Sequence, residues 1–170
     1  MKWPLVQLSD VVDVQLGKML SAASRTNISP AKYLRNANVQ WGRIDTSDLL
    51  EMDFDDDDRD RFSLRKGDLL MCEGGEPGRC AVLDRELPGV FFQKALMRLR
   101  ASTEAITMSF LQRYLQYFAD HGGFSDGGNQ ATIAHFPAIR VRSMYVPMPS
   151  LSEQHRIAVA QPSNYRYPGK

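Results

Sequence analysis

Short apolar runs separated by turn-forming residues dominate the middle of the chain. The run LLM at 69–71 follows a turn, RKGD, and predicts a buried strand that is entered through a tight reversal. Residues 73–78, EGGEPG, contain three glycines and a proline, which favour neither a strand nor a helix. A second apolar run begins at Cys80. We therefore expect two strands joined by a projecting glycine loop.

Other stretches rich in β-forming residues predict further strands. Residues 33–41 alternate between β-forming and polar side chains, and residues 90–92 are wholly apolar. A last strand region is expected within 139–146. Near the start, residues 8–16 predict a helical turn that passes into a strand.

Helices are predicted where apolar residues recur every three or four positions. The clearest begins at Ser109, whose spacing to Gln112 fits a capping box, and stops at Gly122. Its apolar stripe is expected to pack as core and consists of Phe110, Leu111, Tyr114, Leu115 and Phe118. A short helix is expected over 48–52, and another follows the capping box SLSE at 150–153.

The second glycine-rich segment is GGFSDGGNQ at 122–130, with Asn129, Gln130 and Thr132 at its polar tip. A phosphate-binding loop would need a strand before it and a helix after it, whereas here a helix precedes and a β-like run follows. Nucleotide binding is therefore not expected. Loops of small residues instead allow the backbone to approach a ligand closely, as contact with DNA requires.

The chain has the length of one domain, and 43% apolar residues among 170 are enough to fill a core. The elements predict an α/β (α+β) fold, a twisted mixed sheet with a few packed helices and projecting glycine-rich loops. We expect one domain over 1–149, a helix over 150–161 and an irregular tail over 162–170. No run resembles a signal peptide or approaches the ~20 apolar residues of a membrane span, so a soluble, cytoplasmic protein without a membrane partner is expected.

Cys72 and Cys80 flank the first glycine loop. A disulfide between neighbouring strands is conceivable, but two reduced, partly buried thiols are the favoured interpretation in a reducing cytosol. The cysteines and histidines lack the paired short spacings of a structural zinc site, so no metal is expected.

The net charge of +1 conceals an uneven distribution. Residues 51–60, EMDFDDDDRD, carry −6, which leaves +7 on the rest of the chain. A basic body suits a phosphate backbone, although an ordinary solvated surface explains the same excess. The aspartates lack the spacing of a calcium loop and predict a solvated loop that faces away from any nucleic acid.

Three phrases, in this order, resemble the target recognition domain of the DNA specificity subunit of type I restriction-modification enzymes. They are RKGDLLMCEGGEPGRCAV, FFQKALMRLR and GGNQATIAHFPAIRVRSMYVPMPSLSEQHRIA. The resemblance extends from Leu8 to about Ala158, and its most specific part, PMPSLSEQHRI, is similar to the signature that opens the long conserved helix of such subunits.

The resemblance implies a non-catalytic domain that reads one half of a bipartite double-stranded DNA target. It further implies two partners, a methyltransferase subunit that carries S-adenosylmethionine and an ATP-dependent restriction subunit, and no cofactor bound by this chain. In the family the helix continues as a long coiled coil, whereas QPSNYRYPGK has no heptads. Self-association, or pairing with another half subunit, therefore stays open.

Candidate contact residues follow from the chemistry of base edges and phosphates. Arginine, asparagine and glutamine form bidentate contacts to guanine or adenine in the major groove, while lysine and arginine neutralise phosphates. The candidates for base or loop contacts are Arg35, Asn36, Arg43, Arg79, Gln93, Lys94, Asn129, Gln130 and Thr132. The candidates for phosphate contacts are Lys18, Arg25, Lys32 and Lys66.

Two other classes of function stay as alternatives. The chain lacks the cofactor loop and the Asn/Asp-Pro-Pro-aromatic motif of an adenine methyltransferase. A metal-dependent nuclease could use Asp68 and Glu73 with Lys94, provided that these groups converge. A protein-interaction decoy would occupy the methyltransferase subunit without reading DNA.

Overall fold

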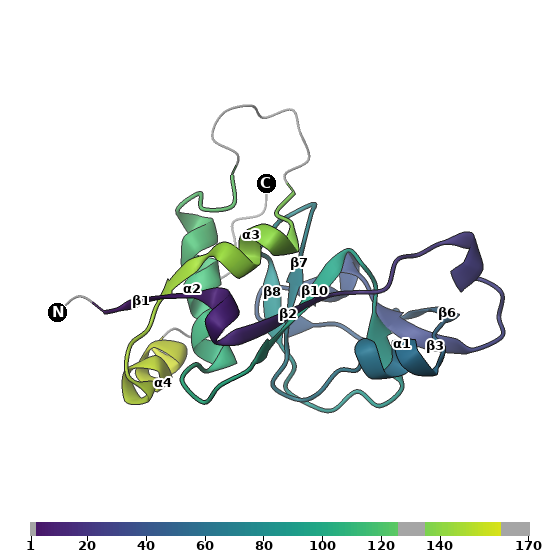
Figure 1. Ribbon diagram of the computed structural model, residues 1–170, viewed down its shortest axis with the longest axis horizontal. Helices are drawn as coiled ribbons and strands as arrows, with labels where there is room; N and C mark the ends of the chain where they lie inside the picture. The colour runs from purple at the N-terminus through teal and green to yellow at the C-terminus, as the bar shows by residue number, and fades with distance from the viewer. Residues whose placement is uncertain (1–2, 126–134, 161–170) are drawn as a thin grey trace.

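The computed structural model describes residues 3–125 and 135–160 of the chain (Figure 1). Its centre is an antiparallel sheet in the order β2-β10-β7-β8. These strands are β2 (Val12–Leu16), β10 (Leu96–Ala101), β7 (Leu69–Cys72) and β8 (Cys80–Val82). The predicted pair of strands around the glycine loop is therefore confirmed as β7 and β8.

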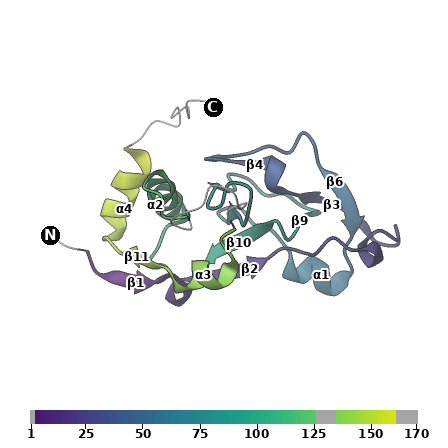
Figure 2. The ribbon, with the colours of Figure 1, turned by 90° about the horizontal axis from the view of Figure 1, so that it is seen from above.

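A second sheet, in the order β6-β3-β9, lies at one end of the long axis beside helix α1 (Figure 2). Its members are β6 (Leu50–Asp53), β3 (Pro30–Leu34), β9 (Val90–Phe92) and the neighbouring α1 (Asp56–Arg61). Strands β3 and β9 run parallel, whereas β3 and β6 run antiparallel. The second sheet is therefore mixed, whereas the central sheet is antiparallel throughout.

Helices gather at the opposite end of the molecule (Figure 2). They are α2 (Met108–Asp120), α3 (Ala138–Ser143) and α4 (Leu151–Val159), beside a two-stranded ribbon of β1 (Leu5–Gln7) and β11 (Tyr145–Pro147). The remaining short elements are η1 (Leu8–Asp10), η2 (Ala22–Ser24), η3 (Asn36–Asn38), β4 (Val39–Gln40) and β5 (Arg43–Ile44). None of the helices in the described ranges is long and apolar enough to cross a bilayer.

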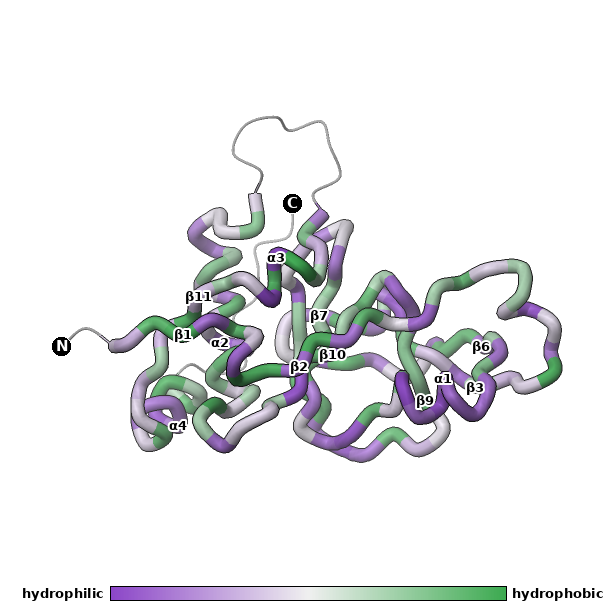
Figure 3. The backbone as a smooth tube through the Cα atoms, in the orientation of Figure 1, coloured by the Kyte–Doolittle hydropathy of each residue, from purple (hydrophilic) through white to green (hydrophobic). Residues whose placement is uncertain are grey.

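Strand β7 is buried on both faces and joins two hydrophobic clusters. Leu69 and Met71 point into the cluster that α2 covers, and Leu70 and Cys72 point into the cluster under the second sheet. Because successive side chains of a strand face opposite ways, one strand serves both clusters. The hydropathy-coloured tube accordingly turns green along the central strands (Figure 3).

The two cysteines belong to opposite clusters and are both free, which agrees with reduced thiols. Burial raises the pKa of the Cys72 thiol and of the Cys80 thiol, so both stay protonated and unreactive near neutral pH. Among the described residues, no group of three histidine, cysteine or acidic side chains is placed to hold a metal ion.

The predicted continuous strand over 33–41 is wrong. Strand β3 ends at Leu34, and the 3-10 turn η3 follows before β4. Asn38, one of the polar residues of the predicted alternation, is buried, and its amide donates to the carbonyls of Asp45 and Asp48 at 3.0 and 2.9 Å. A buried amide that satisfies two carbonyls explains why the alternation breaks here.

The acidic run is a helix, not the solvated loop that its charge predicts. The Asp55 carboxylate caps α1 by accepting from the Asp58 backbone N–H at 2.8 Å. Acids in the first turn and Arg59 and Arg61 in the last turn both suit the helix dipole. The helix expected over 48–52 is also wrong, because that segment enters strand β6.

Helix α2 is confirmed, but its cap is Thr107 rather than Ser109, with the Thr107 hydroxyl accepting from the Phe110 N–H at 3.3 Å. The region 139–146, expected to be a strand, begins as α3 and becomes strand only at β11. The capping box of Ser150 and Glu153 starts α4 as predicted.

Candidate nucleic-acid interface

The first glycine-rich segment connects β7 to β8, on the side of the molecule labelled in Figure 1 by the end of β7. The chain that follows the second glycine-rich segment lies beside it, since Gly74 forms an isolated antiparallel bridge with His135 and the Phe136 N–H donates to the Glu73 carbonyl at 2.8 Å. The backbone at Glu73 and Gly74 is therefore bonded to residues 135 and 136.

An aromatic cluster joins the stems of the two loops. The Phe124 ring stands edge-on to Phe136 and to Phe118, with ring centroids 4.8 and 5.0 Å apart. Gly78 of the first loop packs directly under Phe124, and a Cβ there would lie 2.1 Å from the ring. A side chain at 78 and the Phe124 ring cannot occupy the same space.

Gly78→Ala is therefore expected to lower the free energy of unfolding by about 2 kcal/mol. Alanine is strained at the positive φ of this position, and its Cβ would displace the Phe124 ring. Gly75→Ala is the matched control, because it shares the loop and a positive φ but its Cβ would meet nothing closer than 4.0 Å. Urea unfolding of both variants checks this. Equal losses would show that the Phe124 contact contributes nothing.

A groove of about 320 Å³ lies at the foot of the two loops. It brings together Asn36, Gln93 and Lys94, three of the predicted contact residues, from segments far apart in the sequence. The full lining is Met19, Leu20, Asn36, Glu73, Gly74, Gln93, Lys94, Ala95 and His135. Sequence reasoning placed the glycine loop but not this convergence.

Backbone hydrogen bonds fix the walls of this groove. The Gln93 N–H donates to the Leu34 carbonyl at 3.0 Å, and the Lys94 N–H donates to the Lys18 carbonyl at 2.8 Å. The Asn36 amide donates to the Gly74 carbonyl at 3.1 Å. The groove is thus built on hydrogen-bonded backbone, which limits the ordering that a ligand must impose.

Arg79 holds the first loop in place. Its guanidinium donates to a Glu76 carboxylate oxygen and to the Asn36 carbonyl, both at 3.0 Å. The Trp41 indole N–H donates to the other Glu76 oxygen at 2.7 Å. Arg79 therefore already has a structural task, whether or not it also contacts DNA.

Unsatisfied polar atoms gather at the same place. Within the described parts of the chain, four buried side-chain nitrogen or oxygen atoms lack a hydrogen-bond partner, and three of these belong to Arg35, Asn36 and Arg79. Such atoms cost stability, on the order of 1–3 kcal/mol each. Of the three residues, Asn36 lines the groove, and the Arg79 guanidinium donates to its carbonyl.

A comparison with known families shows to which family the chain belongs. The family model described as "Type I restriction modification DNA specificity domain" matches residues 1–161. The chain belongs to this family. By membership it is a specificity component, whose role is sequence-specific recognition of DNA, and not a catalytic one.

Solved structures of the type I specificity family share the fold. One, reported as "Structural basis underlying complex assembly and conformational transition of the type I R-M system", has a TM-score of 0.67 and 17% identity, with 93% of this chain and 37% of that chain covered. The HsdS subunit of Thermoanaerobacter tengcongensis has a TM-score of 0.61 and 19% identity, with 93% and 36% covered.

The S subunit of a type I system from M. genitalium has a TM-score of 0.60 and 18% identity, with 94% of this chain and 38% of that chain covered. The chain therefore spans little more than a third of the length of these solved subunits. Among curated proteins, none is similar enough to the chain to count as a relative.

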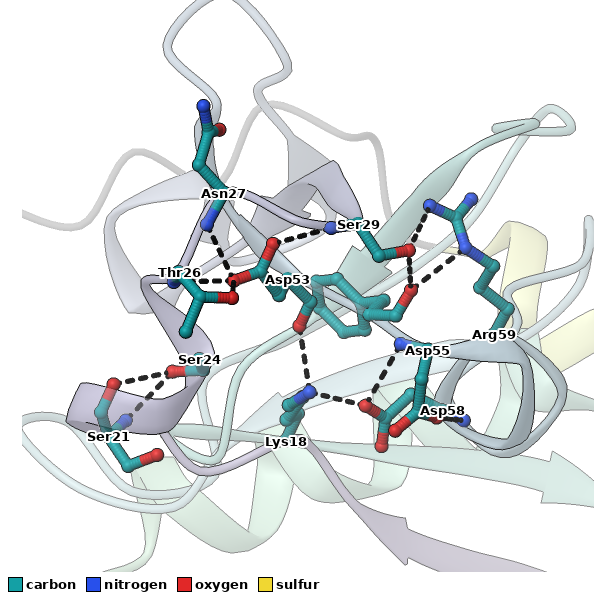
Figure 4. A network of polar contacts seen from close by, with 11 residues as sticks. Lys18, Ser21, Ser24, Thr26, Asn27, Ser29, Asp53, Asp55, Asp58 and Arg59 are labelled. Atoms are coloured by element: carbon teal, nitrogen blue, oxygen red, sulfur yellow. Dashed lines mark hydrogen bonds and ion pairs between the residues drawn. The ribbon is translucent and has the colours of Figure 1, made fainter.

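In this specificity domain, Lys18 is less free than predicted. Its ammonium group forms an ion pair with Asp58 and donates to the Asp53 carbonyl at 2.7 Å (Figure 4). It also lies 5.3 Å from the centre of the Phe54 ring. Contact of Lys18 with a phosphate stays a prediction, but its charge is already neutralised locally.

The Asp53 carboxylate organises the neighbouring segment that carries Arg25 (Figure 4). It accepts from the Thr26 N–H and hydroxyl, the Asn27 N–H and the Ser29 N–H at 2.6–2.9 Å. The Thr26 hydroxyl, followed by these backbone N–H groups, lowers the pKa of Asp53 below its usual value, against the opposite effect of burial.

Because the folded pKa of Asp53 lies below the unfolded one, its carboxylate stabilises the fold above about pH 4 and this contribution disappears as the pH falls through the folded pKa. Asp53→Asn is therefore expected to be less stable at pH 7 and to lose less further stability below pH 4. Urea unfolding over a pH series measures both slopes.

The other predicted contact residues are scattered. Arg25 and Lys32 are exposed on the side of the second sheet, and Arg43 is exposed beside β8, 3.6 Å from Asp45. Arg35 pairs with Asp48. Lys66 is exposed in the turn before β7, at the opposite end of that strand from the glycine loop. Asn129, Gln130 and Thr132 lie outside the described residues.

The nuclease alternative does not fit this geometry. Asp68 and Glu73 lie at opposite ends of β7, about 16 Å apart for five residues of extended chain. Both Asp68 oxygens are bound by Arg100, at 2.6 and 2.7 Å, and the side chain is buried. Two metal ions need carboxylates that converge within a few ångströms, and these do not.

Two titratable residues of the groove, Glu73 and His135, were not assigned to DNA contact from the sequence. Glu73 entered only as a possible nuclease ligand. Its position directly after a buried strand and before Gly74 was the available signal, because side chains at strand ends that open into loops often line sites. His135 carried no comparable signal, since its contact with Glu73 spans 62 positions of chain.

Proposed function

We propose that this chain reads one half of a bipartite double-stranded DNA target for a type I restriction-modification complex. The observation that carries the proposal is the groove in which Asn36, Gln93 and Lys94 meet the first glycine loop. Family membership supports the general role, and the groove supports a specific surface for it.

Within this surface, Gln93 is assigned to a base edge, because a carboxamide matches the donor and acceptor of adenine in the major groove. Asn36 is assigned to holding the loop beside it, because its amide donates to the Gly74 carbonyl and its side-chain oxygen is buried. Lys94, exposed on the rim, is assigned to a phosphate or to guanine. Arg25, Lys32, Arg43 and Lys66 are proposed to contact the backbone. Lys18 contributes less, because Asp58 already balances its charge.

Selection from randomised duplexes tests the proposal, with the chain alone and with the modification subunit of its own system. A single enriched block of bases, one half of a split site, is expected. Gln93→Ala should then relax preference at one position at a cost of about 1–3 kcal/mol, whereas Lys66→Ala should weaken all duplexes equally. Failure to enrich any sequence in either preparation would refute the proposed function.

The proposed partners are the methyltransferase subunit and the restriction subunit of the same system, in the cytoplasm. A groove of about 490 Å³ between α2 and α4 supports a protein partner at the helical end, away from the glycine loops. Aromatic side chains line it, including Trp3, Tyr114 and Tyr117. Helix α4 also carries the sequence that resembles the opening of the conserved family helix.

A decoy that binds the methyltransferase subunit without reading DNA is the alternative function. The observation that favours it is the groove between α2 and α4. The two functions differ in one measurement. A decoy would bind the subunit and show the same weak affinity for every duplex, whereas a reader should prefer its own half-target by a large factor.

A further inference from the structure

The Glu73 carboxylate lies in the groove but has no place in the assignment above. Only 9% of its side chain is exposed, and that part faces a groove shared with Gln93 and Lys94. A carboxylate is costly to bury unless another group pairs with it or donates to it. Its position therefore calls for an explanation beyond packing.

The backbone of Glu73 is hydrogen-bonded on both sides. The Glu73 N–H donates to the Ala95 carbonyl at 3.1 Å, and the Glu73 carbonyl accepts from the Phe136 N–H at 2.8 Å. The His135 imidazole lies beside the carboxylate, with its Nε2 3.4 Å from Oε1. His135 is itself 57% exposed, on the rim of the same groove.

A negative charge in a DNA-facing groove repels phosphates, so it cannot add to general affinity. It gains only where the DNA presents a donor. In the major groove these donors are the exocyclic amines, cytosine N4 and adenine N6, whereas guanine and thymine present acceptors at the corresponding positions. A carboxylate in the groove lining would therefore select for an amine-bearing base and against the others.

We propose that Glu73 is a specificity-determining residue, whose carboxylate accepts a hydrogen bond from the exocyclic amine of one base in the recognised half-target. His135 is a positioning residue that holds the carboxylate. This inference rests on the proposed function and adds to it one named acceptor and one class of base, cytosine or adenine.

The test compares base preference, position by position, for the wild-type chain, Glu73→Gln and His135→Asn. Glu73→Gln has nearly the same shape but adds a donor, so it should admit guanine or thymine at one position and lower the preference there by about ten- to a hundredfold. Affinity for unrelated duplexes should stay the same or rise, because a repulsive charge is removed. The position that changes shows whether the base is cytosine or adenine.

His135→Asn keeps the carboxylate but removes the group that positions it, so it should weaken the preference at the same base position, by less than Glu73→Gln does. Glu76→Gln is the matched control, since it makes the same change in the same loop at a carboxylate bound to Arg79 and Trp41, outside the groove lining. The control should change all sequences alike. If Glu73→Gln fails to fold, Glu73→Asp replaces it, and affinity should fall only for duplexes with the preferred base.

An even loss with Glu73→Gln, equal to that of His135→Asn, would overturn the inference and reduce the pair to a link between the two loops. The proposed function would survive that result, because wild-type selection would still yield a half-target. If the wild-type chain enriched no sequence, the proposed function itself would fail.

Discussion

Asp68→Ala is expected to lower the free energy of unfolding by about 3–5 kcal/mol, because it removes one partner of a buried ion pair. The Asp68 side chain is 2% exposed, and its oxygens accept from Arg100 and from the Arg65 N–H at 2.6–2.7 Å. The hydrogen bond that Arg100 donates to Asp68 raises the pKa of Arg100. The substitution removes this partner but not the charge, because a guanidinium stays protonated in proteins. Arg98, buried beside it, adds a second charge.

Urea unfolding measures this effect, and Asp84→Ala provides a control at an exposed acid with an exposed partner, Arg85. That variant should change stability by less than about 1 kcal/mol. A loss below that value for Asp68→Ala would show that the Arg100 pair is not important to the fold. Under folding conditions Asp68→Ala should bind DNA like the wild type, since Asp68 lies far from the groove.

Affinity for DNA is expected to fall about a thousandfold between about 50 and about 200 mM salt, if roughly six phosphates are contacted. Each neutralised phosphate releases condensed counterions, so the logarithm of the binding constant falls linearly with the logarithm of the salt concentration. Fluorescence anisotropy on one labelled duplex gives the slope.

Single variants then identify the contributing cations. Lys32→Ala and Lys66→Ala should each reduce the salt slope by about one unit, as loss of one phosphate contact requires. Lys18→Ala should leave the slope nearly unchanged, because Asp58 already neutralises that ammonium group. A slope near zero for the wild-type chain would exclude a phosphate-contacting surface of this size.

Local signals in the sequence predicted most of the central sheet. The apolar run before the glycine loop and the capping box at Ser150 are both decided by neighbouring residues, and both are confirmed as β7 and α4. Asn38 could not be predicted, because its burial depends on carbonyls that a later turn supplies. Helix α1 was likewise not predicted, because the run of acidic residues was interpreted by its charge as a loop. The Asp55 cap and the helix dipole stabilise this helix.

The candidate site was predictable only in its parts. The glycine loop and the residue types beside it were visible in the sequence, but the groove depends on contacts between distant segments. The Asn36 amide donates to the Gly74 carbonyl, so Asn36 helps to hold the loop. Lys18 forms an ion pair with Asp58, 40 positions away, so its positive charge is balanced within the fold. Such long-range pairs follow from the tertiary fold, and no local pattern encodes them.

Strand β7 has a consequence for how this protein can change in evolution. Its side chains belong to both hydrophobic clusters, so a poorly fitting substitution there would damage the two ends of the molecule together. Residues 74–78 of the loop that follows belong to neither cluster, and the shape of the loop depends on Gly78 and on the contacts of Glu76 with Arg79 and Trp41. New target preferences can therefore arise through changes in the loop sequence, while strand β7 and the two hydrophobic clusters stay the same.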